Sequence, residues 1–330
     1  MLRGYRLALA LILPSAFSSA QEIPCNVEIP VNVMLPDGSL VRRLSGEAFV
    51  GQNKYGAVGI RLLASDTGPR QILFVMETGK AVRPAARRIE TAVISEICDK
   101  ARPQDSFGLL TAVGPLREMK LGASVAEIRA AADQLGQSPR GKGQTDGVMD
   151  ALLHGVGWFQ PPQPGDAIVL VTMGIEGPHR AGYSKVKTAL AAARIRLFAF
   201  QLGQFYAGFY STGVSIAPNG RLMPTASISP NQENLFALSQ ETGGVAFYEN
   251  TADALHQYKL TDERLKLMSG LAGQIYKAVV EYYPLQTGSS LGGLVLDLAD
   301  PVRKQLPRAT VMYPRHPPDC SPVTGARTDR

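Results

Sequence analysis

Short apolar runs alternate with amphipathic stretches through the middle of the chain. A run such as Ile72–Met76 is apolar at every position, which indicates a strand covered on both faces. A stretch such as Ala85–Lys100 instead repeats its apolar residues at helical spacing. The strands predicted in this way are Ile72–Met76, Phe107–Val113, Ala167–Thr172, Ile195–Phe200 and Val245–Tyr248, and the helices are Ala85–Lys100, Ser124–Leu135, Asp146–Phe159, Tyr183–Ala193 and Asn234–Glu241.

This alternation predicts an α/β fold with a doubly wound, mostly parallel sheet of Rossmann type and helices on both of its faces. Ligands of such sheets bind at the carboxyl ends of the strands. We therefore expect the four loops 77–83, 140–145, 173–182 and 203–233 to lie along one rim of the sheet.

Both flanks of this region are rich in short β-like runs. The runs are Val27–Leu35, Leu40–Arg43, Tyr276–Tyr283, Gly293–Leu298 and Ala309–Tyr313. Neither flank is long enough for a stable sheet alone, so we expect both to pair into one small β domain with the α/β domain inserted between them. The predicted organisation is a signal peptide over 1–20, flanking β domain over 21–66, α/β domain over 67–260, a helix and further strands of the flanking domain over 261–318, and a polar tail over 319–330.

The N-terminus has the features of a secretory signal peptide. Arg3 and Arg6 precede the apolar stretch Leu7–Leu13, and small residues lead to Ala20, after which we expect cleavage. The apolar stretch is shorter than the ~20 residues of a membrane-spanning helix, and no later stretch of the sequence is long and apolar enough to span. The sequence therefore predicts a secreted or periplasmic protein whose mature chain has no membrane span.

Composition and charge narrow the class of partner. Hydrophobic residues make up 45% of the chain and charged residues 19%, which is typical of a globular protein. The formal net charge is +6, but the basic residues are scattered and no aromatic stripe runs beside them. Nucleic acid is therefore not an expected partner, because it requires a concentrated basic patch.

The three cysteines, Cys25, Cys98 and Cys320, allow at most one internal disulfide. Cys98 shares a helical stripe with Ile94 and Ile97, which favours a buried and reduced side chain. Cys25 and Cys320 flank segments that we expect to pair, so we predict a disulfide between them. The sequence contains no CxxC pair, so neither a zinc site nor thioredoxin-like chemistry is indicated.

Short motifs follow the predicted strands in a fixed order. Glu77–Val82 follows the first strand, Gln144–Asp146 precedes a helix, Val171–Gly174 ends a strand and Thr242–Gly244 precedes a Phe-Tyr strand. In this order they resemble the Asp-x-Ser-x-Ser loop, the Gly-x-Thr loop, the Thr-Asp-Gly turn and a late turn of the von Willebrand factor A superfamily, and more narrowly of its secreted bacterial members. The β-like segments Val31–Phe49, Tyr276–Pro284 and Val311–Arg315 are similar to strands that precede and close such domains.

The resemblance implies a metal-ion-dependent adhesion site on the rim, and this sequence departs from its ligand set. Glu77 replaces an aspartate, Gly79 and Ala81 replace two serines, Thr145 is retained, and Met173 replaces a second aspartate. Mg²⁺ prefers hard oxygen ligands, and a thioether is a soft ligand. We therefore predict a degenerate site and no metal cofactor, with weak Mg²⁺ or Ca²⁺ binding by an irregular ligand set as the alternative.

Other rim residues offer substitutes for the lost ligands. Asp146 or Glu176 could act as replacement carboxylates, or they are solvated residues near helix starts. Lys80 or Arg83 could place a cation where the metal would be and pair with Glu77, or they are exposed basic side chains without a role.

The loop after Phe200 is long and carries four aromatic residues, Phe205, Tyr206, Phe209 and Tyr210. Protein interfaces are enriched in aromatic side chains. These residues therefore form a candidate ligand rim together with the charged residues above, unless they fold back onto their own domain.

No sequence motif indicates catalysis. The four histidines, including His154 on a predicted helix, lack metal-ligand spacing, and neither a Gly-x-Ser-x-Gly elbow nor a phosphate-binding loop is present. We therefore predict a non-catalytic, extracytoplasmic module that binds an unidentified protein partner. The alternatives are a metal-dependent adhesion domain and a hydrolase with an unrecognised constellation of residues.

Overall fold

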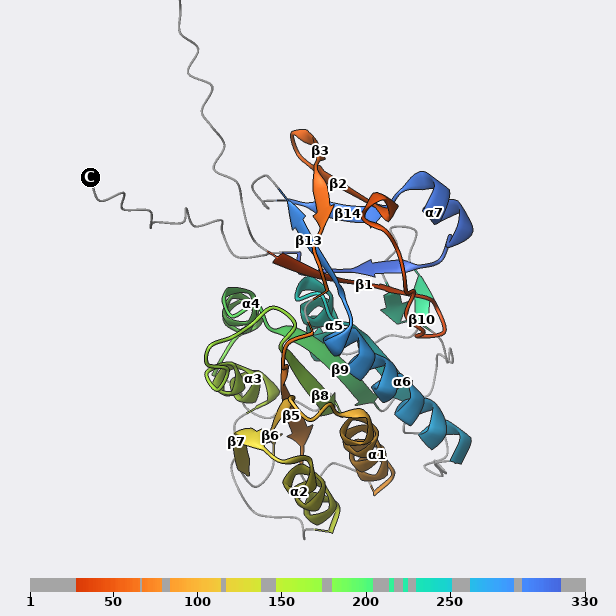
Figure 1. Ribbon diagram of the computed structural model, residues 1–330. Helices are drawn as coiled ribbons and strands as arrows, with labels where there is room; N and C mark the ends of the chain where they lie inside the picture. Colours follow the sequence, from red (N-terminus) through yellow and green to blue (C-terminus); the bar gives the residue numbers. More distant parts are fainter. Residues whose placement is uncertain are drawn as a thin grey trace, which may run out of the picture.

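A parallel sheet with helices on both faces forms the larger part of the structure, and a small β domain lies against one end of it (Figure 1). The computed structural model describes residues 28–65, 67–78, 84–113, 117–137, 147–173, 180–203, 214–216, 222–224, 230–250, 262–287 and 293–315.

The central sheet has six strands in the order β12-β9-β8-β5-β6-β7, parallel except for β7, which runs antiparallel to β6. The fold class predicted from the sequence is confirmed. The strands are β5 (Gln71–Glu77), β6 (Ser106–Ala112), β7 (Glu118–Ala123), β8 (Ala167–Thr172), β9 (Arg196–Gly203) and β12 (Ala246–Asn250), and the helices around them are α1 (Pro84–Lys100), α2 (Val125–Gln137), α3 (Val148–Val156), α4 (Tyr183–Ala192), α5 (Pro230–Glu241) and α6 (Asp262–Val280).

Two apolar layers cover the faces of this sheet. On one face, residues of α1, α2 and α6 pack against Phe74, Val169 and Phe200. On the other, residues of α3, α4 and α5 pack against Val75 and Leu170. Every residue of β8 is buried, which explains the apolar run in its sequence.

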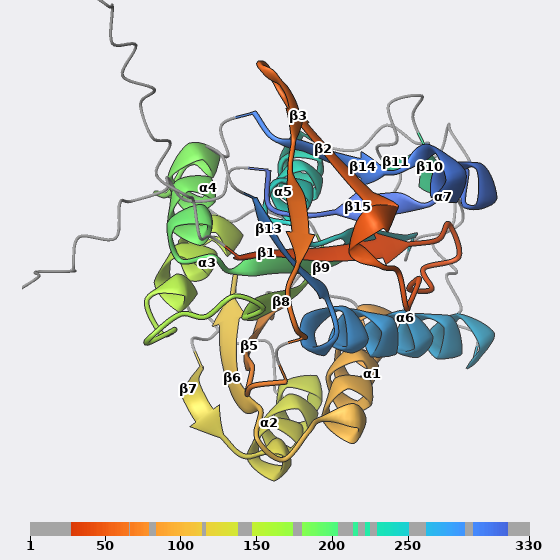
Figure 2. The same cartoon turned by 45° about the horizontal axis from the view of Figure 1, so that its top comes forward.

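The ends of the described chain pair with each other in a small β domain. Strand β1 (Glu28–Met34) lies between β13 (Tyr283–Thr287) and β15 (Thr310–Met312), antiparallel to both, in a sheet of order β15-β1-β13-β4. A second sheet, of order β14-β2-β3, shares a core with it, and its strands lie beside those of the first sheet in Figure 2. The remaining elements are β2 (Phe49–Asn53), β3 (Gly56–Val58), β4 (Ile60–Leu62), β14 (Val295–Leu298), α7 (Asp300–Gln305) and the 3-10 helix Gly46–Ala48.

The structure corrects some of the predicted elements. The run Tyr276–Tyr283 was predicted as a strand, but α6 continues to Val280 because Ile275, Tyr276 and Val279 are buried with α1. The run Leu40–Arg43 contributes only an isolated bridge between Leu40 and Met34. The edge strand β7 was not predicted. Two short strands, β10 (Val214–Ile216) and β11 (Leu222–Pro224), lie within the segment predicted as a loop.

A buried group of charges, here called the joint, connects the two domains at the amino-terminal ends of the strands. Arg196, at the start of β9, is fully buried and donates from Nη1 to Asn32 Oδ1 of β1 at 2.7 Å. Its Nη2 donates to the carbonyl oxygens of Ala278 and Val279, at 3.1 and 3.2 Å, in the last turn of α6. These bonds hold the flanking sheet, α6 and the central sheet in one arrangement.

Tyr282 completes the joint. The guanidinium carbons of Arg70 and Arg196 each lie 5.2 Å from the centroid of its ring, and its hydroxyl donates to Glu28 Oε1 at 2.7 Å. Asp166 lies nearby and accepts from the backbone amide of Gln71 at 2.9 Å. Burial lowers the pKa of Arg196 to about 10 and raises the pKa of Asp166 to about 6.

Candidate functional site

The carboxyl ends of the parallel strands meet at one edge of the sheet, here called the rim. Met76 pairs with Val171, and Thr172 pairs with Gln201, so β5, β8 and β9 end side by side. Ligands of doubly wound sheets bind at this edge. The rim is therefore the candidate functional site, as the sequence predicts.

Glu77, the last residue of β5, turns its carboxylate inward and is 0% exposed. Its Oε2 accepts from the hydroxyl of Thr172 at 2.5 Å and from the backbone amide of Met173 at 2.8 Å. Thr172 is the last residue of β8, and Met173 directly follows it. The carboxylate at the predicted metal position therefore joins the ends of two neighbouring strands.

Met173 occupies the position of the second aspartate of the resemblance, and it too is buried, with 2% of its surface exposed. Its side chain packs in the apolar layer that contains Phe200 and Leu202. Its backbone amide, rather than its side chain, supplies its contact with Glu77.

A second buried acid, Glu90 of α1, lies behind Glu77 and was not predicted from the sequence. Burial raises the pKa of Glu90 to about 8, with the charge of Glu77 adding to the rise and Arg87 opposing it. Among the described residues, Glu90 Oε1 has no hydrogen-bond partner. The sequence of α1 could have indicated Glu90, because this acid stands among the apolar residues of the buried helix face, which are Ala86, Ile89, Val93, Ile94 and Ile97.

Charged side chains also fix the stems of the rim loops. Asp150, in the first turn of α3, accepts from the backbone amides of Arg180 and Ala181 at 2.8 and 2.7 Å. Arg87 donates to the carbonyl oxygen of Thr78 at 3.0 Å, immediately after Glu77. The segment after β8 is thus held at one end by Glu77 and at the other by Asp150. Sequence reasoning missed Asp150 because it belongs to no motif.

Most of the predicted site residues lie outside the described part of the chain. These are Gly79, Lys80, Ala81, Arg83, Thr145, Asp146, Glu176, Phe205, Tyr206, Phe209 and Tyr210, and the cysteines Cys25 and Cys320. Cys98 is described, buried and free, and burial raises the pKa of its thiol to about 11. His154 lies on the surface of α3, where its Nε2 is 3.1 Å from Glu118 Oε1.

The described residues offer neither a cluster of metal ligands nor a membrane-spanning helix. Within these ranges, no group of three or more His, Cys, Asp or Glu side chains is placed to hold a metal ion. None of the helices that the structure describes combines the length and the apolar character needed to cross a membrane.

The order of the strands identifies the fold. From β5 the strands are added outward on one side, to β6 and β7, and then on the other, from β8 through β9 to β12. This is the 3-2-1-4-5-6 order of doubly wound sheets. Glu77 ends β5 and Met173 directly follows β8, at the places that the family resemblance assigns to them. The α/β domain has a von Willebrand factor A-type fold.

Solved structures with this type of fold are among those similar to the chain. One is an aerotolerance-related membrane protein from Bacteroides fragilis, with 14% identity over 63% of this chain and 99% of that chain, at a TM-score of 0.41. Another is a von Willebrand factor type A protein from Catenulispora acidiphila, with 12% identity over 80% of this chain and 52% of that chain, at a TM-score of 0.42.

A third is the VWA domain of SpRpn10, with 9% identity over 62% of this chain and 97% of that chain, at a TM-score of 0.39. At these identities the similarity concerns the fold alone. No protein-family profile matches the sequence, and no curated protein matches it either.

Proposed function

We propose that this chain is a non-catalytic, extracytoplasmic protein-binding module with a degenerate metal-ion-dependent adhesion site, which binds its partner through the rim largely without metal. The observation that carries the proposal is the position of Glu77. Its carboxylate is buried and accepts hydrogen bonds from Thr172 and Met173. A metal ligand on a binding rim must instead direct an oxygen toward an open coordination position.

The chemistry of the neighbouring position also supports binding without metal. Met173 carries a thioether, which hard cations avoid, and its side chain is buried in an apolar layer. In the family resemblance, positions 77 and 173 would each supply a carboxylate to the cation. Here only Glu77 is a carboxylate, and it already bonds to Thr172 and Met173 at the end of the neighbouring strand. The rim is therefore better suited to present loops than to coordinate an ion.

The loop after β9 is the part of the rim that we assign to the partner. Strand β9 ends at Gly203 on the rim, and the aromatic residues from Phe205 to Tyr210 follow it in the sequence. Aromatic side chains dominate the affinity of many protein interfaces, and truncating one often costs 2 kcal/mol or more, about thirtyfold in affinity. The extracytoplasmic location rests on the signal peptide predicted over residues 1–20.

Affinity capture from the native envelope tests the proposal. The full chain and its Phe205→Ala and Tyr210→Ala variants are used as bait, with and without a chelator. Tyr55→Ala serves as the matched control, because Tyr55 is 82% exposed on the flanking domain, between β2 and β3. We expect the wild type and the control to retain the same partner in chelator, and the two loop variants to lose it.

Three results would contradict this. Loss of the partner in chelator would indicate a metal-dependent adhesion domain. Loop variants with a lower melting temperature but unchanged capture would show that the aromatic residues are structural. Turnover of an ester, peptide or glycoside would exclude a non-catalytic module.

A further inference from the structure

Strand β15 is the outermost strand of its sheet, and one of its edges has no neighbouring strand in the part of the chain that the structure describes. On the other edge, Val311 pairs with Val33 of β1. The carbonyl oxygen of Val33 accepts from the amide of Val41 at 2.8 Å, on the far side of β1, so Val33 and Val311 exchange no hydrogen bonds with each other. Val311 therefore directs its N–H and C=O groups away from β1, toward the open edge.

The open edge is closed at its carboxyl-terminal end. Just after β15, Pro314 forms an isolated antiparallel bridge with Thr242, and the amide of Arg315 donates to the carbonyl oxygen of Glu241 at 2.8 Å. Successive residues of a strand direct their backbone groups to opposite sides, so Arg315 and Val311 use the same edge. A strand that added to β15 at Val311 would therefore meet the segment of Thr242 and would have to end there.

Arg303 limits the same edge at its other end. Its Nη1 donates to the carbonyl oxygen of Ala309 at 2.6 Å, immediately before β15. Residues 310–313 remain between this contact and the bridge, a length of ~13 Å at the rise of a β-strand. The open stretch therefore suits only a few residues of an extended peptide.

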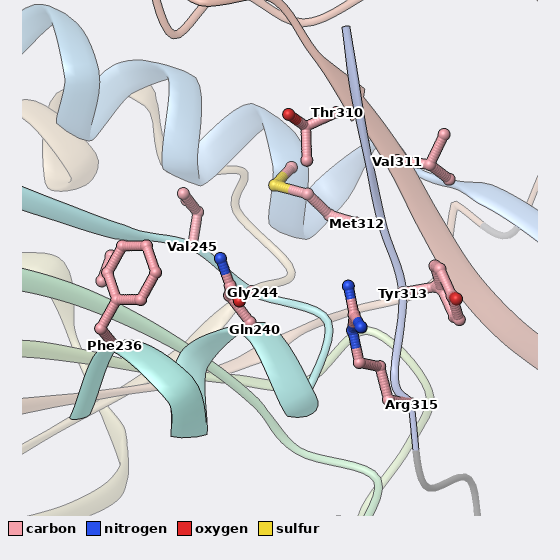
Figure 3. A pocket seen from close by; sticks show the side chains of 10 residues that line it. Phe236, Gln240, Gly244, Val245, Thr310, Val311, Met312, Tyr313 and Arg315 are labelled. Carbon is pink, nitrogen blue, oxygen red and sulfur yellow. The ribbon is translucent and has the colours of Figure 1, made fainter. Parts of the chain in front are cut away.

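A cavity of about 380 Å³ lies beside this open stretch, between β15 and the segment that joins α5 to β12 (Figure 3). Its walls include the buried apolar side chains of Phe236, Val245 and Met312. Figure 3 shows Thr310 and Met312 turned toward Val245. Because Val245 directly precedes β12, the cavity lies near the amino-terminal ends of the parallel strands, at the opposite end of the sheet from the rim.

Arg315 supplies a positive charge to this cavity, at the end where the bridge closes the edge. Figure 3 shows its guanidinium beside β15, facing the side of Gln240. The carboxylate of Glu241 pairs with Lys187 Nζ at 2.8 Å, and none of the ion pairs between described residues includes Arg315. The charge of Arg315 is therefore available to an anion that enters the cavity.

We propose that this cavity binds the carboxyl terminus of a partner protein, whose last residues add to β15 as a short parallel strand. A peptide on this edge must end at the bridge. An amino terminus there would be repelled by Arg315, whereas a terminal carboxylate pairs with it, so the peptide runs in the same direction as β15.

The rest of the cavity defines the other contacts of this peptide. The N–H and C=O groups of Val311 bond to its backbone, as in other cases of strand addition. Its last side chain is apolar and enters the cavity between Val245 and Met312. The site is separate from the rim and does not depend on the function proposed for the rim.

Calorimetric titration of the full chain with synthetic peptides tests the proposal. The probes are acetylated tetrapeptides that end in valine, leucine or phenylalanine, each prepared as a free acid and as a carboxyl-terminal amide. We expect the acids to bind and the amides to bind about tenfold more weakly, because an amide loses the charge-assisted contact with Arg315. Equal affinity of acids and amides, or no binding of any acid at millimolar concentration, would overturn the proposal.

Two variants separate the carboxylate contact from the strand pairing. Arg315→Gln should bind the acids only as well as the amides. Val311→Pro removes an N–H that β1 does not use, and should weaken acids and amides alike. Arg308→Gln is the matched control, because Arg308 is an exposed basic residue of the same segment outside the cavity, and it should bind as the wild type does.

Melting temperatures establish that each variant is folded before its affinity is compared. If Val311→Pro does not fold, a peptide methylated on its backbone amides replaces it, and this peptide should bind the wild type more weakly. A difference between acids and amides that survives in Arg315→Gln would contradict the assigned carboxylate contact. Octanoate that binds as tightly as the peptide acids would show that the cavity accepts any apolar acid, and would overturn the strand pairing.

Discussion

The joint and the rim both bury charged side chains, but they satisfy them differently. At the joint, Arg196 donates to an amide oxygen of β1 and to carbonyl oxygens at the end of α6, where a helix favours a cation. At the rim, Glu90 is buried beside the charge of Glu77, and one of its oxygens has no hydrogen-bond partner among the described residues. Burial lowers the pKa of Arg196 to about 10, so Arg196 still carries its charge at neutral pH, whereas burial raises the pKa of Glu90 to about 8 and favours its neutral form.

This difference separates a structural group from a functional one. A buried charge that bonds to several distant segments, as Arg196 does through Nη1 and Nη2, fixes the geometry of the domains that supply its partners. Buried acids with strongly raised pKa values gather at functional sites more often than elsewhere. We therefore infer that the joint sets the position of the flanking domain, while the rim tolerates electrostatic strain beneath the loops that it presents.

The largest effect is expected from breaking the joint. Arg196→Met leaves Asn32 Oδ1 and two carbonyl oxygens of α6 without their donor, and we expect a loss of ~3–5 kcal/mol in the free energy of unfolding. Urea denaturation measures it. The matched control is Lys100→Met, which removes an exposed ion pair with Glu96 and should change stability by ~0.5 kcal/mol or less. Equal losses in the two variants would mean that the joint is no stronger than a surface pair.

At the rim we expect a smaller effect in the opposite direction, because Glu90→Gln should raise the free energy of unfolding. The pKa of Glu90 is about 8 in the folded chain against 4.5 for an ordinary glutamate, so the folded state holds the proton more tightly. Stability from Glu90 is therefore present below pH 4.5 and is lost as the pH rises toward 8. Glu90→Gln removes this loss, and each unit of raised pKa corresponds to ~1.4 kcal/mol.

Melting curves of the two proteins from pH 5 to pH 8 check this. We expect Glu90→Gln to become progressively more stable than the wild type, by roughly 2–4 kcal/mol at pH 8. Comparison with the wild type cancels the contribution of Asp166, whose pKa is also raised. A stability difference that does not change with pH would remove the electrostatic contrast between the two regions.

The contrast explains what the sequence could and could not predict. The strands β5 and β8 were predicted because burial on both faces leaves an uninterrupted apolar run. The capping box of α2 was also predictable, since Ser124 and Glu127 bond each other within one turn. The sequence pattern therefore predicts an element correctly where the contacts that determine it are made between residues close together in the sequence.

Contacts between distant segments were not predictable in this way. The run Tyr276–Tyr283 contains aromatic and β-branched residues that favour a strand, yet packing of Ile275 and Val279 on α1 makes most of it helical. The joint depends on Arg196 and Asn32, which lie 164 residues apart. At the rim, the position of Glu77 was predicted, whereas its bond to Thr172 and the roles of Glu90 and Asp150 required the structure.

A still smaller effect is expected where Asp150 holds the stem of a rim loop. Arg180 and Ala181 donate to different oxygens of Asp150, so Asp150→Asn keeps an acceptor for only one of the two amides and also loses the charge, and we expect a loss of ~1 kcal/mol or more. Hydrogen exchange of these two amides should become faster. Unchanged exchange at both amides would show that Asp150 does not fix the loop.

The most direct test of the proposed binding without metal is the melting temperature in millimolar Mg²⁺, Ca²⁺ or Mn²⁺, measured for the wild type and for Glu77→Gln. The variant keeps an acceptor for the Met173 amide and removes the negative charge that a cation needs. A ligand at 100 times its dissociation constant stabilises a protein by ~2.7 kcal/mol, a shift of several degrees. We predict no shift with any of the three ions in either protein. A rise in the wild type that is absent in Glu77→Gln would contradict the account.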